Sequence, residues 1–131
     1  MILLDTHVLV WTVSSSSRLS REATHQIRKA QTQDGCAIAS ITLWELGLLF
    51  QRNRLRGSGT IEASVREILD RSRVHVMEIT PDIVALAMSF PESYPKDPGD
   101  RLIGATARAL GITLITQDER ILASPLVRSV W

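Results

Sequence analysis

The opening stretch MILLDTHVLVW, Met1–Trp11, decides the fold, because an apolar run ends there in a carboxylate and passes straight into a second apolar segment. Met1–Asp5 predicts a strand buried on both faces of a parallel sheet, since its apolar residues are continuous rather than alternating. The residues from Thr6 to about Val13 predict a short helix. We therefore expect a strand that leads directly into a helix, with Asp5 at the junction.

The rest of the chain continues this alternation. Further strands are predicted at Cys36–Ala39, Val74–Ile79, Ile112–Thr116 and Leu126–Val130. Further helices are predicted at Arg21–Gln33, Leu43–Gln51, Thr60–Arg71, from Pro81 onward, at Asp100–Leu110 and after Asp118. Strands that alternate with helices in a chain of 131 residues indicate a single domain, residues 1–131. The expected fold class is a three-layer α/β/α sandwich with a central, mainly parallel sheet of about five strands.

Local signals set some of the predicted boundaries. Either Ser40 or Thr42 is suited to cap the helix that follows the second strand. The segment Phe90–Gly99 contains three prolines and a glycine, which predicts a loop, so that Asp100 opens the next helix. Gly111 is suited to end that helix, because glycine readily adopts the left-handed conformation found at helix ends.

Composition excludes several classes of protein. The net charge of +1 does not indicate a nucleic-acid binder by itself, so any such binding must use a local basic surface or metal ions. The single cysteine, Cys36, excludes an internal disulfide. The N-terminus lacks the basic segment of a signal peptide, and no apolar run approaches the ~20 residues needed to span a bilayer. We predict a cytoplasmic protein without a membrane segment.

Acidic residues stand where predicted strands end and helices begin. Asp5 closes the first strand, Asp118 follows the fourth, and Asp100 opens a helix. Glu45 lies near the start of the helix after the second strand, so it can reach the same sheet edge. In parallel sheets this carboxyl edge is where ligands bind. We therefore expect the four carboxylates to lie near one another.

A cluster of carboxylates calls for a counter-ion. Two such charges ~4 Å apart repel by ~4 kcal/mol at an effective dielectric constant near 20. Mg²⁺ and Mn²⁺ favour oxygen ligands and relieve this repulsion. Each acid also has a purely structural alternative, as a helix cap, a partner of a helix dipole or a surface charge. Taken alone, the cluster indicates only a metal or phosphate site.

At these residues the sequence resembles the PIN-domain family, and within it the VapC-type toxins of bacterial toxin–antitoxin pairs. The matching pieces are MILLDTHVLVW at the start, SITLWELGLL around Glu45, DPGDRLIGATA around Asp100 and LITQDERI around Asp118. Their order and spacing cover nearly the whole chain. The combination is much more specific than any single piece.

The resemblance implies an endoribonuclease that depends on Mg²⁺ or Mn²⁺ and hydrolyses RNA phosphodiester bonds with metal-activated water. It assigns metal binding to Asp5, Glu45, Asp100 and Asp118, of which Asp118 stands at the position that varies most within the family. It further implies tRNA or another structured RNA as substrate, a VapB-type antitoxin as partner, and a homodimer.

Several neighbouring residues are candidates for supporting roles. Thr6 and Thr116 are suited to orient a carboxylate or a bound water, or to cap an element. Asp97 either assists a second metal or terminates the loop, and we favour the loop. Arg101 either pairs with a carboxylate or contacts phosphate. Gly99, where similar proteins often carry a bulkier residue, is expected to loosen the loop without touching a metal ligand.

Basic and aromatic residues give weaker signals. Arg52, Arg54 and Arg56 are candidates for RNA backbone contacts, because forked arginine donors suit phosphates, although a solvated loop is the alternative for each. Three histidines lack any metal-ligand spacing and are expected to be solvated or half-buried: His7, His25 and His75. The tryptophans are expected to be core or interface residues: Trp11, Trp44 and Trp131.

Two other functions remain as alternatives. A non-catalytic PIN-like module would bind RNA or a protein, and loss of the acidic set would be its signature, whereas here the set is intact. A phosphatase of the haloacid-dehalogenase type would need a DxDxT pattern, but Asp5 is followed by Thr6 and His7. We therefore favour the nuclease.

Overall fold

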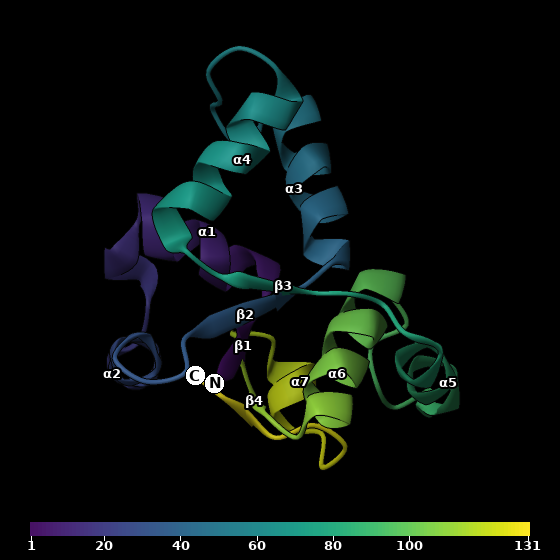
Figure 1. Cartoon of the computed structure of the whole chain (residues 1–131). Coiled ribbons are helices and arrows are strands. Elements are labelled where there is room, and N and C mark those ends of the chain that lie inside the picture. Colours follow the sequence, from purple (N-terminus) through teal and green to yellow (C-terminus); the bar gives the residue numbers. More distant parts are fainter.

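The computed structural model describes residues 1–131 and contains one sheet of five strands (Figure 1). The strands are β1 (Ile2–Leu4), β2 (Cys36–Ala39), β3 (His75–Met77), β4 (Thr113–Ile115) and β5 (Ser129–Val130). Their order is β3-β2-β1-β4-β5, and every pairing is parallel. The predicted parallel sheet of about five strands is confirmed.

Helices occupy most of the remaining chain. They are α1 (Thr6–Ser14), α2 (Arg21–Gln31), α3 (Ile41–Gln51), α4 (Ile61–Ser72), α5 (Pro81–Ser89), α6 (Pro98–Leu110) and α7 (Glu119–Leu122), with a short 3₁₀ turn, η1, at Ser16–Arg18. None of these helices combines the length and the apolar character that crossing a membrane requires.

The two faces of the sheet carry separate cores, so the fold has three layers as predicted. Alternate residues of a strand point to opposite faces, and in β1 Leu4 packs with α1, α2, α3 and α4, whereas Leu3 packs with α5, α6 and α7. Figure 1 shows α5 and α6 together on one side of the molecule and α1 and α4 on another. The central strands β1 and β2 are fully buried, which explains their continuous apolar sequences.

The outer strands are shorter than predicted. β3 covers His75–Met77 rather than the whole of Val74–Ile79, and β5 covers only Ser129–Val130. Both lie at the edges of the sheet, where one neighbour is missing. Val76 in β3 is 42% exposed.

Two predicted helix starts need correction. Helix α3 begins at Ile41, and neither proposed cap acts: the Ser40 side chain makes no capping bond, and Thr42 is buried inside the helix. Helix α6 begins at Pro98 rather than at Asp100, because Asp97 is the capping residue. Gly111 ends α6 with φ +67°, as predicted.

The strand order fixes where a ligand can bind. The chain runs outward from β1 through β2 to β3, and β4 and β5 lie on the other side of β1. Neighbouring strands β1 and β4 are therefore followed by connections that lead in opposite directions. In open parallel sheets the crevice at such a point is the usual binding site.

The packing of Leu3 predicts a large effect of truncating its side chain. Leu3 is 0% exposed at the centre of the sheet, whereas Leu110, at the end of α6, is 45% exposed. We expect Leu3→Ala to lower the free energy of unfolding by about 2–5 kcal/mol, because it leaves a cavity. The matched Leu110→Ala change should shift it by no more than about 0.5 kcal/mol. Urea unfolding measures both, and equal losses would contradict this packing.

Candidate functional site

A cleft of about 670 Å³ opens beyond the carboxyl ends of β1 and β4. All four predicted carboxylates line it: Asp5, Glu45, Asp100 and Asp118. The side chains come from separate segments, namely the end of β1, helix α3, helix α6 and the turn before α7. The fold thus brings together residues that are up to 113 positions apart in the chain.

Asp5 is held by hydrogen bonds at both carboxylate oxygens. Its Oδ1 accepts from the backbone N–H of Thr6 at 2.8 Å, which makes Asp5 the cap of α1. Its Oδ2 accepts from the hydroxyl of Thr116 at 2.7 Å. The same hydroxyl accepts from the backbone N–H of Asp118 at 3.1 Å. Buried Thr116 therefore links the end of β1 to the turn that carries Asp118.

Glu45 is oriented by the buried hydroxyl of Thr6, which in turn contacts the hydroxyl of Thr42. The Thr6 hydroxyl donates to Glu45 Oε1 at 2.6 Å and lies 3.0 Å from the Thr42 hydroxyl. Thr42 and Glu45 are three residues apart in α3, so they share one face of the helix. The helical spacing could have indicated Thr42 as part of the site, whereas the sequence analysis considered it only as a cap.

Gly99 gives Glu45 the space that its carboxylate occupies. A Cβ at Gly99 would lie 2.6 Å from Glu45 Oε2 and 3.0 Å from Asp97 Oδ2, so a side chain there would displace them. Gly99 also lies inside α6 and is buried. The expectation that Gly99 loosens a loop and touches no candidate ligand was therefore wrong.

Asp97 caps α6, and Asp100 lies in its first turn. Asp97 Oδ2 accepts from the backbone N–H of Asp100 at 3.1 Å, which agrees with the favoured structural role of Asp97. Burial is the largest cause, and the negative charges of Asp5 and Asp97 come next; together with the other cleft acids they raise the pKa of Asp100 to about 7. Burial also raises the pKa of Glu45, although its hydrogen bond from Thr6 opposes that effect.

Arg101 does not pair with a carboxylate, which was one of its two predicted roles. Its guanidinium donates to the backbone carbonyls of Phe90 at 2.7 Å, Pro91 at 3.0 Å, and Ala87 and Tyr94 at 3.3 Å. It forms no ion pair. Arg101 therefore fastens the proline-containing loop to α6, and its donors are directed at carbonyls rather than at the cleft.

Asp118 differs from the other three acids because an arginine side chain pairs with it. It caps the short helix α7 and forms an ion pair with Arg120 at 3.0 Å. The hydrogen bonds from the Arg120 guanidinium lower the pKa of Asp118. Asp118 therefore caps a helix, which was its predicted structural alternative, and also lines the cleft.

The three candidate RNA-contact arginines lie in different places. Arg52 lines the cleft, whereas Arg54 and Arg56 do not. Arg56 borders a separate depression between α3 and α4. The predicted basic cluster is therefore divided by the fold, because the chain turns after α3 ends at Gln51.

Other residues at the site lacked a clear sequence signal. The exposed His7 lines the cleft, and its proximity to Asp5 in the sequence could have suggested this. Tyr94 is 1% exposed, and its hydroxyl lies 3.5 Å from the Asp100 carbonyl oxygen. It occupies space left by Gly104, where a Cβ would collide with the Tyr94 hydroxyl. No local pattern in the loop predicted that contact.

The tryptophans fall into three environments. Trp11 is buried, as expected for a core residue, and Trp131 packs edge-on against it with 5.8 Å between ring centroids. Trp44 is 67% exposed, so the prediction of a core position was wrong for this residue.

The donor set fits a hard divalent cation in chemical type. Every candidate ligand is a carboxylate oxygen, which Mg²⁺ and Mn²⁺ prefer. The pKa of Asp100 is raised first by burial and then by the charges of the neighbouring acids, and a cation would offset both effects. As the side chains stand, no three acidic, histidine or cysteine groups are close enough to hold one ion together. Mg²⁺ commonly uses only one or two carboxylates with several waters, so three converging side chains are not required.

Comparisons with known proteins agree with this architecture. The sequence profile of the PIN domain matches residues 2–124. Ribonuclease VapC22 of Mycobacterium tuberculosis is 35% identical over 132 aligned residues, which cover 99% of this chain and 98% of that relative.

Solved structures share the fold across nearly the whole chain. VapBC2 from Rickettsia felis, bound to a DNA fragment from its promoter, matches with a TM-score of 0.73 and 17% identity, covering 99% of this chain and 98% of that one. DNA-bound VapBC from Salmonella typhimurium matches with a TM-score of 0.72, 19% identity and the same coverage. At these identities the likeness shows the fold alone.

The pKa of Asp100 predicts a pH-dependent effect on stability. In the folded chain this carboxyl keeps its proton up to about pH 7, against an ordinary value of 3.8. Folding is therefore unaffected by Asp100 below about pH 3.8 and becomes less favourable as the pH rises from there through 7. We expect Asp100→Asn to be more stable than the parent chain at pH 8, and the difference to disappear towards pH 4.

Urea unfolding in the presence of EDTA measures this difference. The matched control is Asp70→Asn, because Asp70 is exposed on α4 and lies outside the cleft. This control should follow the parent chain at both pH values. An Asp100→Asn variant that is no more stable than the parent at pH 8 would contradict the electrostatic description of the cleft.

Proposed function

The chain belongs to the PIN-domain family, and from this membership we propose that it is a metal-dependent endoribonuclease of the VapC type, the toxin of a toxin–antitoxin pair. The relative that is 35% identical over its full length is named a ribonuclease, which supports RNA as the substrate. The observation that carries the proposal is the lining of one cleft by Asp5, Glu45, Asp100 and Asp118.

We assign the four carboxylates to the binding of Mg²⁺ or Mn²⁺. A bound divalent cation supplies an acidified water and stabilises the negative charge that develops during phosphodiester hydrolysis. Asp5 is suited to this role because it lies at the switch point of the sheet. Thr6 bonds both neighbours, Asp5 through its backbone N–H and Glu45 through its hydroxyl, and Asp100 comes from α6.

Thr6 and Thr116 act as positioning residues in this proposal. The Thr6 hydroxyl donates to Glu45 and the Thr116 hydroxyl donates to Asp5. Each of these bonds uses only one lone pair of the carboxylate that it orients. Such supporting hydrogen bonds fix the orientation of metal ligands in proteins. Asp97 acts in a different way: its carboxylate accepts from the backbone N–H of Asp100 and so fixes the helix start that carries this candidate ligand.

We propose partners of three kinds. The substrate is RNA, with tRNA or another structured RNA as the expected target. A VapB-type antitoxin is the expected protein partner, since the similar solved structures include toxin–antitoxin complexes. A homodimer is the expected assembly, and the exposed Trp44 and Met88, at 67% and 78%, are apolar side chains of the kind found in interfaces.

The assignment of Asp5 predicts the loss of RNA cleavage in Asp5→Asn. The amide keeps one oxygen for the helix cap but carries no charge for a cation. We expect the cleavage rate with Mg²⁺ or Mn²⁺ to fall by about 100-fold or more, since changes to supporting groups of metal ligands already cost 10- to 100-fold. The measurement is cleavage of total RNA or tRNA by purified protein.

The control for this experiment is Asp70→Asn, which should cleave RNA at the rate of the parent chain. Circular dichroism establishes that both variants are folded. Undiminished cleavage by folded Asp5→Asn would contradict the assignment of the site. RNA binding without cleavage by the parent chain would instead favour a non-catalytic module.

The division of the basic cluster predicts unequal roles for two nearby arginines. Arg52 lines the cleft and Arg54 does not, although both are exposed. In the Asp5→Asn background, Arg52→Gln should weaken RNA binding and lower the dependence of log Kd on log salt by about 0.7–1, the value of one phosphate contact. Arg54→Gln should leave that slope unchanged. Equal slopes for the two variants would contradict a specific contact from Arg52.

A further inference from the structure

The carboxylate of Asp118 is bound on both oxygens by one residue. Asp118 Oδ1 accepts from the backbone N–H of Arg120 at 2.9 Å and from its Nε at 3.3 Å. Asp118 Oδ2 accepts from Arg120 Nη2 at 3.0 Å. The guanidinium therefore covers both oxygens of a carboxylate that faces the cleft. The other three cleft acids have no arginine or lysine within ion-pair distance.

The remaining arginines near the cleft are differently engaged. Arg101 directs its donors at backbone carbonyls, and Arg52 forms no ion pair. Arg120 is thus the one arginine whose charge is delivered directly to a cleft carboxylate. Its side chain is 67% exposed, so it is free to move into solvent when the ion pair opens.

We propose that Arg120 is the resident counter-ion of Asp118, and that a divalent cation reaches this carboxylate only by displacing the guanidinium. This inference rests on the proposed function, because it takes the cleft to be a site for such a cation. The guanidinium and the cation carry charge of the same sign and need the same oxygens. They therefore exclude each other by contact as well as by repulsion.

The position of Asp118 does not depend on the guanidinium. Its backbone N–H donates to the Thr116 hydroxyl, and its Oδ1 also accepts from the Arg120 backbone N–H. Both bonds remain when the Arg120 side chain leaves or is replaced. The carboxylate would then stay at the cleft with the Oδ2 atom available to a cation. The binding of a divalent cation to Asp118 is therefore controlled by the side chain of Arg120, two residues away.

The test is the affinity of the full-length chain for Mn²⁺ alone, measured by titration calorimetry without RNA. We expect Arg120→Gln to bind Mn²⁺ about two- to fivefold more tightly than the parent chain, as follows from the usual strength of an exposed ion pair. An affinity equal to or lower than that of the parent chain would overturn the proposal.

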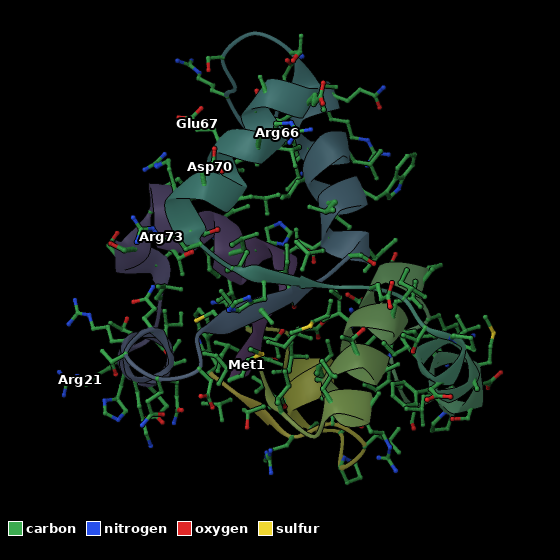
Figure 2. All side chains as sticks on the ribbon, viewed as in Figure 1. Met1, Arg21, Arg66, Glu67, Asp70 and Arg73 are labelled. Carbon is green, nitrogen blue, oxygen red and sulfur yellow. The ribbon has the colours of Figure 1, made fainter.

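The matched control is Arg66→Gln. Arg66 forms an exposed ion pair with Glu62 at the same 3.0 Å distance, but it projects from α4 outside the cleft (Figure 2). Its replacement removes the same charge from the molecule and should leave the Mn²⁺ affinity unchanged. A gain equal to that of Arg120→Gln would show that net charge alone is responsible, which would overturn the proposal.

A double-mutant cycle distinguishes competition for Asp118 from a general effect of nearby charge. In the Asp118→Asn background, Arg120→Gln should no longer raise the affinity for Mn²⁺, because the shared carboxylate is gone. A gain that persists undiminished in this background would overturn the proposal. Failure of the parent chain to bind Mn²⁺ would be a different result, since it would contradict the proposed function itself.

Discussion

Repulsion among carboxylates in a single half-buried cleft is the constraint around which the site is organised. Asp100 shows it most directly, because burial and its acidic neighbours raise its pKa to about 7. Hydroxyl and backbone N–H groups donate to these carboxylates, no lysine contacts them, and a single arginine pairs with Asp118. Hydrogen bonds of this kind stabilise the charged form and fix its direction without filling the cleft with cations.

The sheet makes this arrangement possible. The backbone N–H of Asp5 bonds to the carbonyl of Ile115 at 3.0 Å, so the ends of β1 and β4 are held side by side. The two buried threonines then connect the ends of the strands to the acids, Thr116 from the position just after β4 and Thr6 from the first turn of α1. Main-chain hydrogen bonds thus align residues that are remote in sequence, independently of their side chains.

Long side chains limited what could be predicted. Arg101 follows Asp100 directly, which suggested a carboxylate or phosphate partner, yet its guanidinium reaches backwards to the loop at Phe90 and Pro91. No role was predicted for Arg120 from the sequence, although its guanidinium binds Asp118. Gly99 was assigned to a loop, and its actual contact is the space filled by Glu45. In each case the contact partner depends on the position of the side chain in the folded structure. Local sequence propensity does not specify that position.

The sequence by itself determined the alternation of strands and helices, the parallel sheet and the placing of acids at strand ends and helix starts. These follow from apolar runs, caps and the rule that parallel strands end at one edge. Only the tertiary structure decided which hydroxyl supports which carboxylate, and that Arg52 rather than Arg54 faces the cleft. The physical reason is that hydrogen bonds and excluded volume act over a few ångströms. The partners of Glu45 and Asp5 therefore exist only once β1, β4, α3 and α6 have packed together.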